Sequence, residues 1–281
     1  MSLELPDNLV EPIVRAALAE DLGRAGDVTV AACIDLQARM SVTYISRQNG
    51  VVSGLSCVRL AISAMDPDAV ISFEARDGDV IGPGSVLARV EGRAGAILTA
   101  ERTALNLLGR MSGVATLTGA YVFAVRGTKA RITDTRKTTP GLRALEKYAV
   151  RCGGGVNHRF GLDDAILIKD NHIAACGGVG EALERARAHV GHMMKIEIEV
   201  DTLEQFDEAL TFAPDVIMLD NFDLDDMAEA VRRNAGKVAL EASGGVNLQT
   251  VAAIARTGVD VISVGALTHS APVLDIGLDA A

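Results

Sequence analysis

Basic side chains are concentrated in one segment of an otherwise acidic chain. The 281-residue sequence has a formal net charge of −10, yet residues 131–159 contain seven Arg or Lys against two acids. Within this segment, DTRKTTPGL (134–142) and CGGGVNHR (152–159) place charged side chains next to glycine and proline. Arginine, lysine and backbone N–H groups are the usual partners of carboxylate and phosphate. The pattern therefore predicts a site for a compact anionic ligand.

Four residues of these two motifs are the strongest candidates for that site, namely Arg136, Lys137, His158 and Arg159. The remaining basic residues have another interpretation, because Arg143, Lys147 and Arg151 are spaced four apart, as on a solvated helix face. We expect those three to raise the local potential or to pair structurally.

Two glycine-containing turns are candidates for phosphate binding. Ser243–Gly245 follow the run VALEA, and Val264–Ala266 follow the run VIS. Small residues after the last strands of a βα barrel often bind phosphate through backbone N–H groups. The occurrence of two such turns after successive runs strengthens the prediction.

Two acids stand at the ends of neighbouring strand-like runs. Glu199 lies near the end of IEIEV, and Asp220 closes VIMLD, so they are candidates for Mg²⁺ held mainly through a phosphorylated ligand. A salt bridge with Lys169 or Lys195 is the second interpretation, and the spacing leaves both open.

Alternating strand-like and helical runs must position these residues. The step from Ile198 to Leu219 to Leu240 is 21 residues each time, a pitch typical of βα units and a parallel sheet. Polar residues end most of these runs, at the rim where βα barrels carry their chemistry. In KIEIEV, alternation places Lys195, Glu197 and Glu199 toward the barrel interior. The six runs are RITDT (131–135), AILIKDN (165–171), KIEIEV (195–200), DVIMLDN (215–221), KVALEASGG (237–245) and DVISVGAL (260–267). They predict an open α/β barrel of six strands, or seven if the segment before Arg131 hides one.

The first hundred residues predict a different, smaller domain. A helix over 8–20 precedes short runs with Gly and Pro turns, typical of antiparallel strands in an α+β domain. DGDVIGPGSVLARVEG looks like a carrier-domain turn but has no lysine to bear a prosthetic group. Residues 100–124 predict a linker helix or helix pair. The expected short strands are MSVTYIS, GVVSGL, AVISFEA, VIGPGSVLARVEG and GAILTA.

Composition excludes several classes of protein. No apolar run approaches the roughly 20 residues of a membrane span, and the N-terminal residues lack a signal-peptide pattern. We therefore expect a cytoplasmic protein without membrane partners, and four cysteines without metal-site spacing are expected to be reduced. An acidic chain without a basic tail is not expected to bind nucleic acid.

The motifs together resemble the quinolinate phosphoribosyltransferase family over nearly the whole chain. The resemblance rests on DTRKTTPGLRALEKYAVRCGGGVNHRFGLDDAILIKDNHI, with EDLGRAGDVT, RTALNLLGRMSGVAT, IEIEV, IMLDN, EASGG and VGALTHS around it. It implies transfer of phosphoribosyl from 5-phosphoribosyl 1-pyrophosphate to quinolinate with decarboxylation. The products would be nicotinate mononucleotide, pyrophosphate and CO₂, in de novo NAD biosynthesis.

The resemblance also implies an architecture and an assembly. The fold would be an open-faced, seven-stranded, TIM-like α/β barrel over 113–268, with an N-terminal α+β sandwich domain over 1–112. The tail, 269–281, would pack back on the sandwich domain. A homodimer would share its active sites.

Residue roles follow from the same resemblance. Lys137, Lys169, Glu199 and Asp220 would be catalytic, and Glu199 and Asp220 would hold Mg²⁺, partly through substrate. Arg102 would reach the neighbouring subunit's site. The substrate-binding set would comprise Arg102, Thr135, Arg136, Lys137, His158, Arg159, Lys169, Glu199, Asp220, Ser243, Gly244, Gly245, Val264, Gly265 and Ala266.

Different functions remain open at this point. A related phosphoribosyltransferase could use nicotinate, or be the molybdenum-transport-associated paralogue that shares DTRKT. KDNH (169–172) favours quinolinate, because a second acceptor carboxylate needs a further cation such as Lys169. An aldolase-like barrel with Lys169 as a Schiff-base lysine also remains open, as does a non-catalytic phosphate-binding barrel.

Overall fold

The computed structural model describes residues 4–280, and the chain divides into two compact units. The first unit comprises 1–119, 138–154 and 267–281, and the second comprises 120–137 and 155–266. The helix α5 (Arg143–Cys152) therefore belongs to the first unit, although it lies between two strands of the second in sequence.

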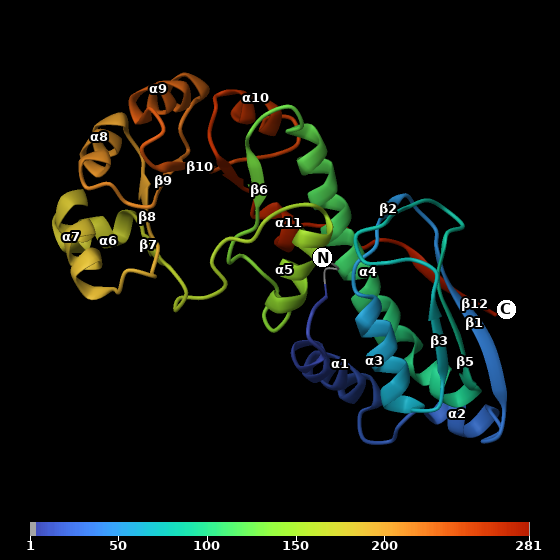
Figure 1. Ribbon diagram of the computed structural model, residues 1–281. Coiled ribbons are helices and arrows are strands. Elements are labelled where there is room, and N and C mark those ends of the chain that lie inside the picture. Colours follow the sequence, from blue (N-terminus) through green and yellow to red (C-terminus); the bar gives the residue numbers. More distant parts are fainter. Residues whose placement is uncertain (1–3, 281) are drawn as a thin grey trace. The chain divides into compact units, whose positions relative to one another are not determined.

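The second unit is a single layer of parallel strands with helices on its outer side (Figure 1). Its strand order is β6-β11-β10-β9-β8-β7, and β6 is not paired with β7, so the barrel is open. The strands are β6 (Arg131–Thr133), β7 (Ile166–Ile168), β8 (Ile196–Val200), β9 (Val216–Asp220), β10 (Ala239–Ser243) and β11 (Val261–Ser263). All six predicted strand runs and the α/β fold class are thus confirmed.

Of the two strand counts left open by the sequence, six matches the sheet of the described residues, and no strand lies directly before Arg131. That segment is the end of the helix α4 (Ala94–Ala124) and a turn, whereas Val156 forms an isolated parallel bridge with Thr133. Val156 also donates its N–H to the carbonyl of Ile132 at 2.8 Å. The glycine-rich segment thus extends the sheet edge beside β6 by one residue.

Amphipathic helices alternate with the strands, as the sequence periodicity predicts. Thr202 and Asp223 cap α8 and α9 through their side chains, which accept N–H groups of the first turn. The helices of this unit are α6 (Asp170–Cys176), α7 (Val179–His189), α8 (Leu203–Thr211), α9 (Leu224–Asn234) and α10 (Val251–Arg256). Strand residues such as Ile198, Ile217 and Leu240 are at most 1% exposed and form the core beneath these helices.

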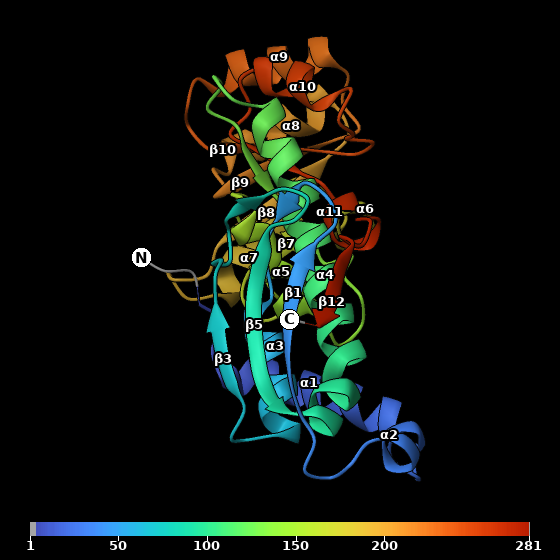
Figure 2. The same ribbon diagram turned by 90° about the vertical axis from the view of Figure 1, so that its right-hand side faces the viewer.

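The first unit contains a four-stranded antiparallel sheet of order β12-β1-β5-β3, which Figure 2 shows face-on. The strands are β1 (Arg39–Ser46), β3 (Val70–Phe73), β5 (Val86–Arg93) and β12 (Ile276–Ala280), with β2 (Gly50–Val51) and β4 (Val80–Ile81) pairing separately. The C-terminal residues pair with β1, from Val42 opposite Ala280 to Ser46 opposite Ile276.

The helices of this unit are α1 (Asp7–Leu22), α2 (Val28–Cys33), α3 (Leu55–Met65), α5 and α11 (Ala266–His269), with most of α4. The expectation of a strand at GAILTA is wrong, because these residues begin α4, a single helix of 31 residues. Among residues 4–280, no helix has both the length and the hydropathy that a membrane span requires.

Candidate active site

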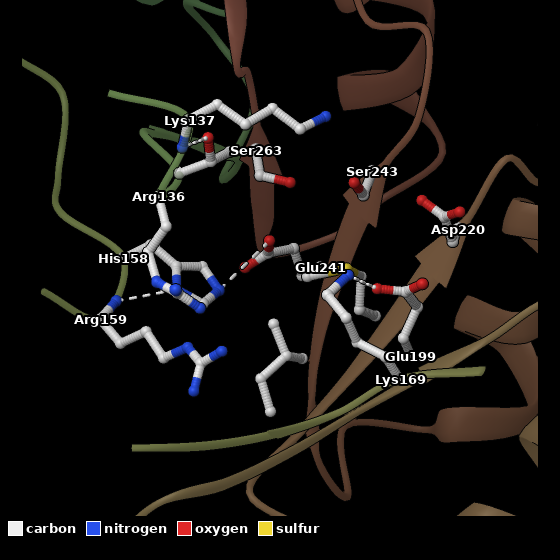
Figure 3. A pocket seen from close by; sticks show the side chains of 13 residues that line it. Arg136, Lys137, His158, Arg159, Lys169, Glu199, Asp220, Glu241, Ser243 and Ser263 are labelled. Atoms are coloured by element: carbon white, nitrogen blue, oxygen red, sulfur yellow. Dashed lines mark hydrogen bonds and ion pairs between the residues drawn. The ribbon is translucent and has the colours of Figure 1, made fainter. Parts of the chain in front are cut away.

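A cavity of about 280 Å³ lies at the carboxyl ends of the barrel strands, and every residue that lines it belongs to the second unit (Figure 3). The structure brings nine of the predicted site residues together around it. They are Thr135, Arg136, Lys137, His158, Arg159, Lys169, Glu199, Asp220 and Ser243. Leu167, Met218, Glu241 and Ser263 complete the lining.

The two basic motifs meet through a buried carboxylate. Asp134, which directly follows β6, is fully buried and accepts the side-chain N–H of Asn157 at 2.6 Å and the backbone N–H of His158 at 3.0 Å. This carboxylate fixes the glycine-rich loop against the segment that carries Arg136 and Lys137. Arg136 and Lys137 themselves are exposed at the rim.

His158 lies between the loop backbone and two buried acids. Its Nδ1 accepts the backbone N–H of Arg159 at 2.8 Å, so Nε2 carries the proton of the neutral ring. Nε2 lies 2.9 Å from Glu197 Oε2 and 3.7 Å from Glu241 Oε1. The ring therefore donates to Glu197, and Glu241 lies beyond hydrogen-bond distance.

The guanidinium group of Arg159 is held by one hydrogen bond and still has an N–H group that can donate to a ligand. One terminal nitrogen donates to the carbonyl of Ala165 at 2.9 Å, while its buried Nε has no hydrogen-bond partner within residues 4–280. Burial, followed by the charge of Arg136, lowers the pKa of Arg159. A buried guanidinium nitrogen without a partner is costly, so this side chain favours an anionic ligand.

The acids at the opposite side of the cavity have different partners. Glu199 is 8% exposed and is paired with Lys169, as one of the two interpretations of the sequence predicts. Asp220 accepts the side-chain N–H of Asn221 at 2.6 Å. In Figure 3, Lys169 and Glu199 lie beside Asp220 and opposite His158 and Arg159.

The prediction that Lys195 points into the barrel is wrong. It precedes β8, its side chain is 74% exposed, and its Nζ lies 2.5 Å from Asp215 Oδ1. Glu197 and Glu199 of the same run are buried, as alternation predicts. The prediction of a solvated helix face is also wrong for Lys147, which is only 4% exposed on α5.

The two glycine turns follow β10 and β11, but among their residues only Ser243 lines the described cavity. Gly244 has a φ of +92°, and a Cβ there would lie 2.1 Å from Asn221 Oδ1, so only glycine fits. Val264, Gly265 and Ala266 follow β11 directly. Arg102 lies on α4 in the first unit, with a side chain 65% exposed.

Glu241 and Ser263 are the polar lining residues that sequence reasoning missed. Alternation along VALEAS places Glu241 on the same strand face as Ser243, which was the available signal. Ser263 holds the equivalent place at the end of β11.

Comparisons with known proteins place most of the chain in one family. The model of the quinolinate phosphoribosyl transferase C-terminal domain matches residues 114–279, and that of the N-terminal domain matches residues 27–112. The nicotinate-nucleotide pyrophosphorylase [carboxylating] of Mycobacterium leprae is 48% identical over 95% of both chains. A probable enzyme of the same name from Bacillus subtilis is 44% identical over 92% of this chain and 89% of its own.

Solved structures give the same result. The nicotinate-nucleotide pyrophosphorylase of Francisella tularensis superposes with a TM-score of 0.95 at 38% identity, covering 100% of this chain and 99% of the other. That of Ehrlichia chaffeensis has a TM-score of 0.92 at 40% identity, covering 96% and 98%. With both domain models matched in order along the chain, the protein belongs to the quinolinate phosphoribosyl transferase family.

Proposed function

We propose that the protein transfers phosphoribosyl from 5-phosphoribosyl 1-pyrophosphate to quinolinate and decarboxylates the adduct to nicotinate mononucleotide. The observation that carries this proposal is the gathering of Arg136, Lys137, Arg159 and Lys169 around one cavity in a protein of net charge −10. Quinolinate is a dianion and the phosphoribosyl donor a polyanion, so the reaction needs such a set of cations. Family membership supports the same reaction.

We assign the two ends of the cavity to the two substrates. Arg136, His158 and Arg159 lie together at one end, where bidentate guanidinium groups suit the carboxylates of quinolinate. Asp220 and Ser243 lie at the other end. Gly244, which directly follows Ser243 in the sequence, begins a turn that suits a 5′-phosphate. Lys169 lies between the acids Glu199 and Asp220 and the end of the cavity assigned to quinolinate. Lys137, at the rim, suits the pyrophosphate group of the donor.

The chemistry then has two steps. The pyridine nitrogen attacks C1 of the ribose as pyrophosphate leaves, and the developing positive charge is stabilised by the carboxylates of Glu199 and Asp220. The 2-carboxylate then departs as CO₂ and leaves its bonding electron pair on C2, where the adjacent positively charged ring nitrogen stabilises it. Exclusion of water from the cavity favours this loss, because the carboxylate loses the hydration that stabilises it.

We also propose Mg²⁺ as the metal cofactor. Asp220 and Glu199 offer carboxylate oxygens of the kind that Mg²⁺ prefers, but Glu199 is already paired with Lys169. Asp220 would therefore be the better protein ligand, and oxygens of the bound substrate and of water would provide most of the remaining binding. When bound, Mg²⁺ would neutralise charge on the leaving pyrophosphate.

A homodimer with shared sites is part of the proposal. It is supported by the resemblance of RTALN to the family motif and by the exposed Arg102 side chain. An arginine from a second copy would add another cation for the acceptor carboxylates.

A substrate comparison tests the function. The purified protein is incubated with the phosphoribosyl donor, MgCl₂ and either quinolinate or nicotinate, and nicotinate mononucleotide is quantified. We expect turnover with quinolinate and at least about 100-fold less with nicotinate, since Lys169 and Arg159 would lack a carboxylate partner. Turnover of nicotinate without turnover of quinolinate would contradict the proposal.

A further inference from the structure

Glu241 is a buried acid on the wall of the reaction cavity. It lies in the middle of β10, is 4% exposed, and lines the cavity together with His158 and Ser263. The substrate-binding and catalytic roles proposed for the other lining residues do not involve it. Its Oε1 has no hydrogen-bond partner within the described part of the chain.

The surroundings of Glu241 disfavour a negative charge there. Glu197 on β8 and Asp134 after β6 are buried acids near it, and the single Nε2–H of His158 is donated to Glu197. Burial raises the pKa of Glu241 to about 8, and the charge of Glu197 adds to this increase. The imidazole of His158 and a hydrogen bond with Ser263 lower the pKa of Glu241 and so act in the opposite direction. A neutral carboxyl group relieves the repulsion among the three acids.

The proposed reaction, on which this inference rests, requires a proton that the substrates do not bring. Loss of CO₂ leaves an electron pair on C2 of the pyridinium ring, and C2 must gain a proton. We propose that Glu241 is the proton donor to C2 in the step that follows decarboxylation.

The step balances in atoms and charge. The C2–carboxylate bond breaks, CO₂ leaves, and its bonding electrons stay on C2. The O–H bond of Glu241 then breaks, the proton forms the new C2–H bond, and Glu241 becomes a carboxylate that solvent reprotonates after product release.

This transfer also keeps the cavity's charge constant. The substrate carboxylate that neutralised the cations Arg136, Arg159 and Lys169 disappears as CO₂, and the new carboxylate of Glu241 replaces its charge. Before the reaction, a neutral Glu241 does not repel the dianionic acceptor. Glu199 and Asp220 also line the cavity but are less suited, because Glu199 is paired with Lys169 and Asp220 with Asn221.

Glu241→Gln tests the proposal, because glutamine keeps the shape and the hydrogen-bonding groups but has no transferable acidic proton. The matched control is Glu204→Gln on α8, an exposed acid of the same unit. Both variants and the wild type are assayed with quinolinate, the phosphoribosyl donor and MgCl₂ for kcat, for KM of quinolinate and for their pH dependence.

We expect E241Q to lose about 100-fold or more in kcat, the usual range for a general acid, with KM within about threefold of wild type. The wild-type kcat should fall as pH rises above about 8, and the residual E241Q activity should lack this decline. E204Q should match the wild type. A kcat of E241Q within about threefold of wild type, or a rise in KM alone, would overturn the proposal.

The wild-type enzyme provides a second measurement that does not depend on a variant's folding. Bound nicotinate mononucleotide in D₂O should exchange its C2 hydrogen for deuterium, because the Glu241 carboxylate can remove the same proton. The exchange rate should rise with pH to a plateau above about pH 8. Absence of exchange, or exchange independent of pH, would count against Glu241. Turnover of quinolinate by the wild type reports on the proposed function separately.

Discussion

His158 is oriented from several directions, and each contact limits what the ring can do. Asp134 holds its backbone N–H, the Arg159 N–H occupies Nδ1, and Glu197 accepts from Nε2. A neutral ring with its proton on Nε2 is the consequence. The imidazole therefore adds polarity rather than a full positive charge to the acceptor end of the cavity.

Asp134 should control acceptor binding without touching the acceptor. In Asp134→Asn, an NH₂ group replaces one carboxylate oxygen and faces the N–H donor of Asn157 or of His158. The hydrogen bond lost in this way should lower the stability of the loop conformation by about 1–3 kcal/mol. We expect the KM for quinolinate to rise by about tenfold, with a smaller effect on kcat.

Steady-state kinetics and a melting curve check this prediction, with Asp163→Asn in the exposed part of the same loop as the control. An unchanged KM in a folded Asp134→Asn variant would show that the loop is positioned by other contacts.

At the scale of elements, the strands were predictable because each carries a compact β-branched run followed by polar residues. The rim acids and cations were predictable for the same reason, since parallel strands end at one edge. Alternation failed at Lys195, which precedes the first residue of β8 and pairs with Asp215. A side chain in the alternating pattern is buried only if its residue lies within the strand, and Lys195 lies one residue before β8 begins.

Two further elements were not predictable from local patterns. GAILTA has the β-branched and small residues of a strand, but continuation of the helical pattern through residue 124 incorporates it into α4. The helix α5 shows a basic face in sequence, yet its Glu146 is fully buried and accepts from Arg110 at 2.7 Å. For α5, a contact with a residue distant in sequence accompanies the burial of Glu146.

At the scale of the whole molecule, the proposed homodimer makes each active site depend on two chains. Arg102 would come from one copy and Lys137 from the other. Arg102→Ala and Lys137→Ala homodimers should therefore both be nearly inactive. A mixture of the two variants that has exchanged subunits should contain heterodimers with one intact site.

Random reassortment of equal amounts predicts recovery of about a quarter of the wild-type activity, because half the dimers are mixed and each has one intact site of two. Activity is measured before and after subunit exchange, with each variant alone as the control. No recovery despite demonstrated exchange would mean that Arg102 and Lys137 act within one chain.

The central claim is that one cavity both joins the two substrates and decarboxylates the product. Its most direct test follows quinolinate labelled at the 2-carboxylate, with simultaneous measurement of CO₂ and nicotinate mononucleotide. We predict one CO₂ released for each nicotinate mononucleotide formed, with release dependent on the phosphoribosyl donor. Formation of a phosphoribosylated product that retains the label, or label release without the donor, would contradict the account.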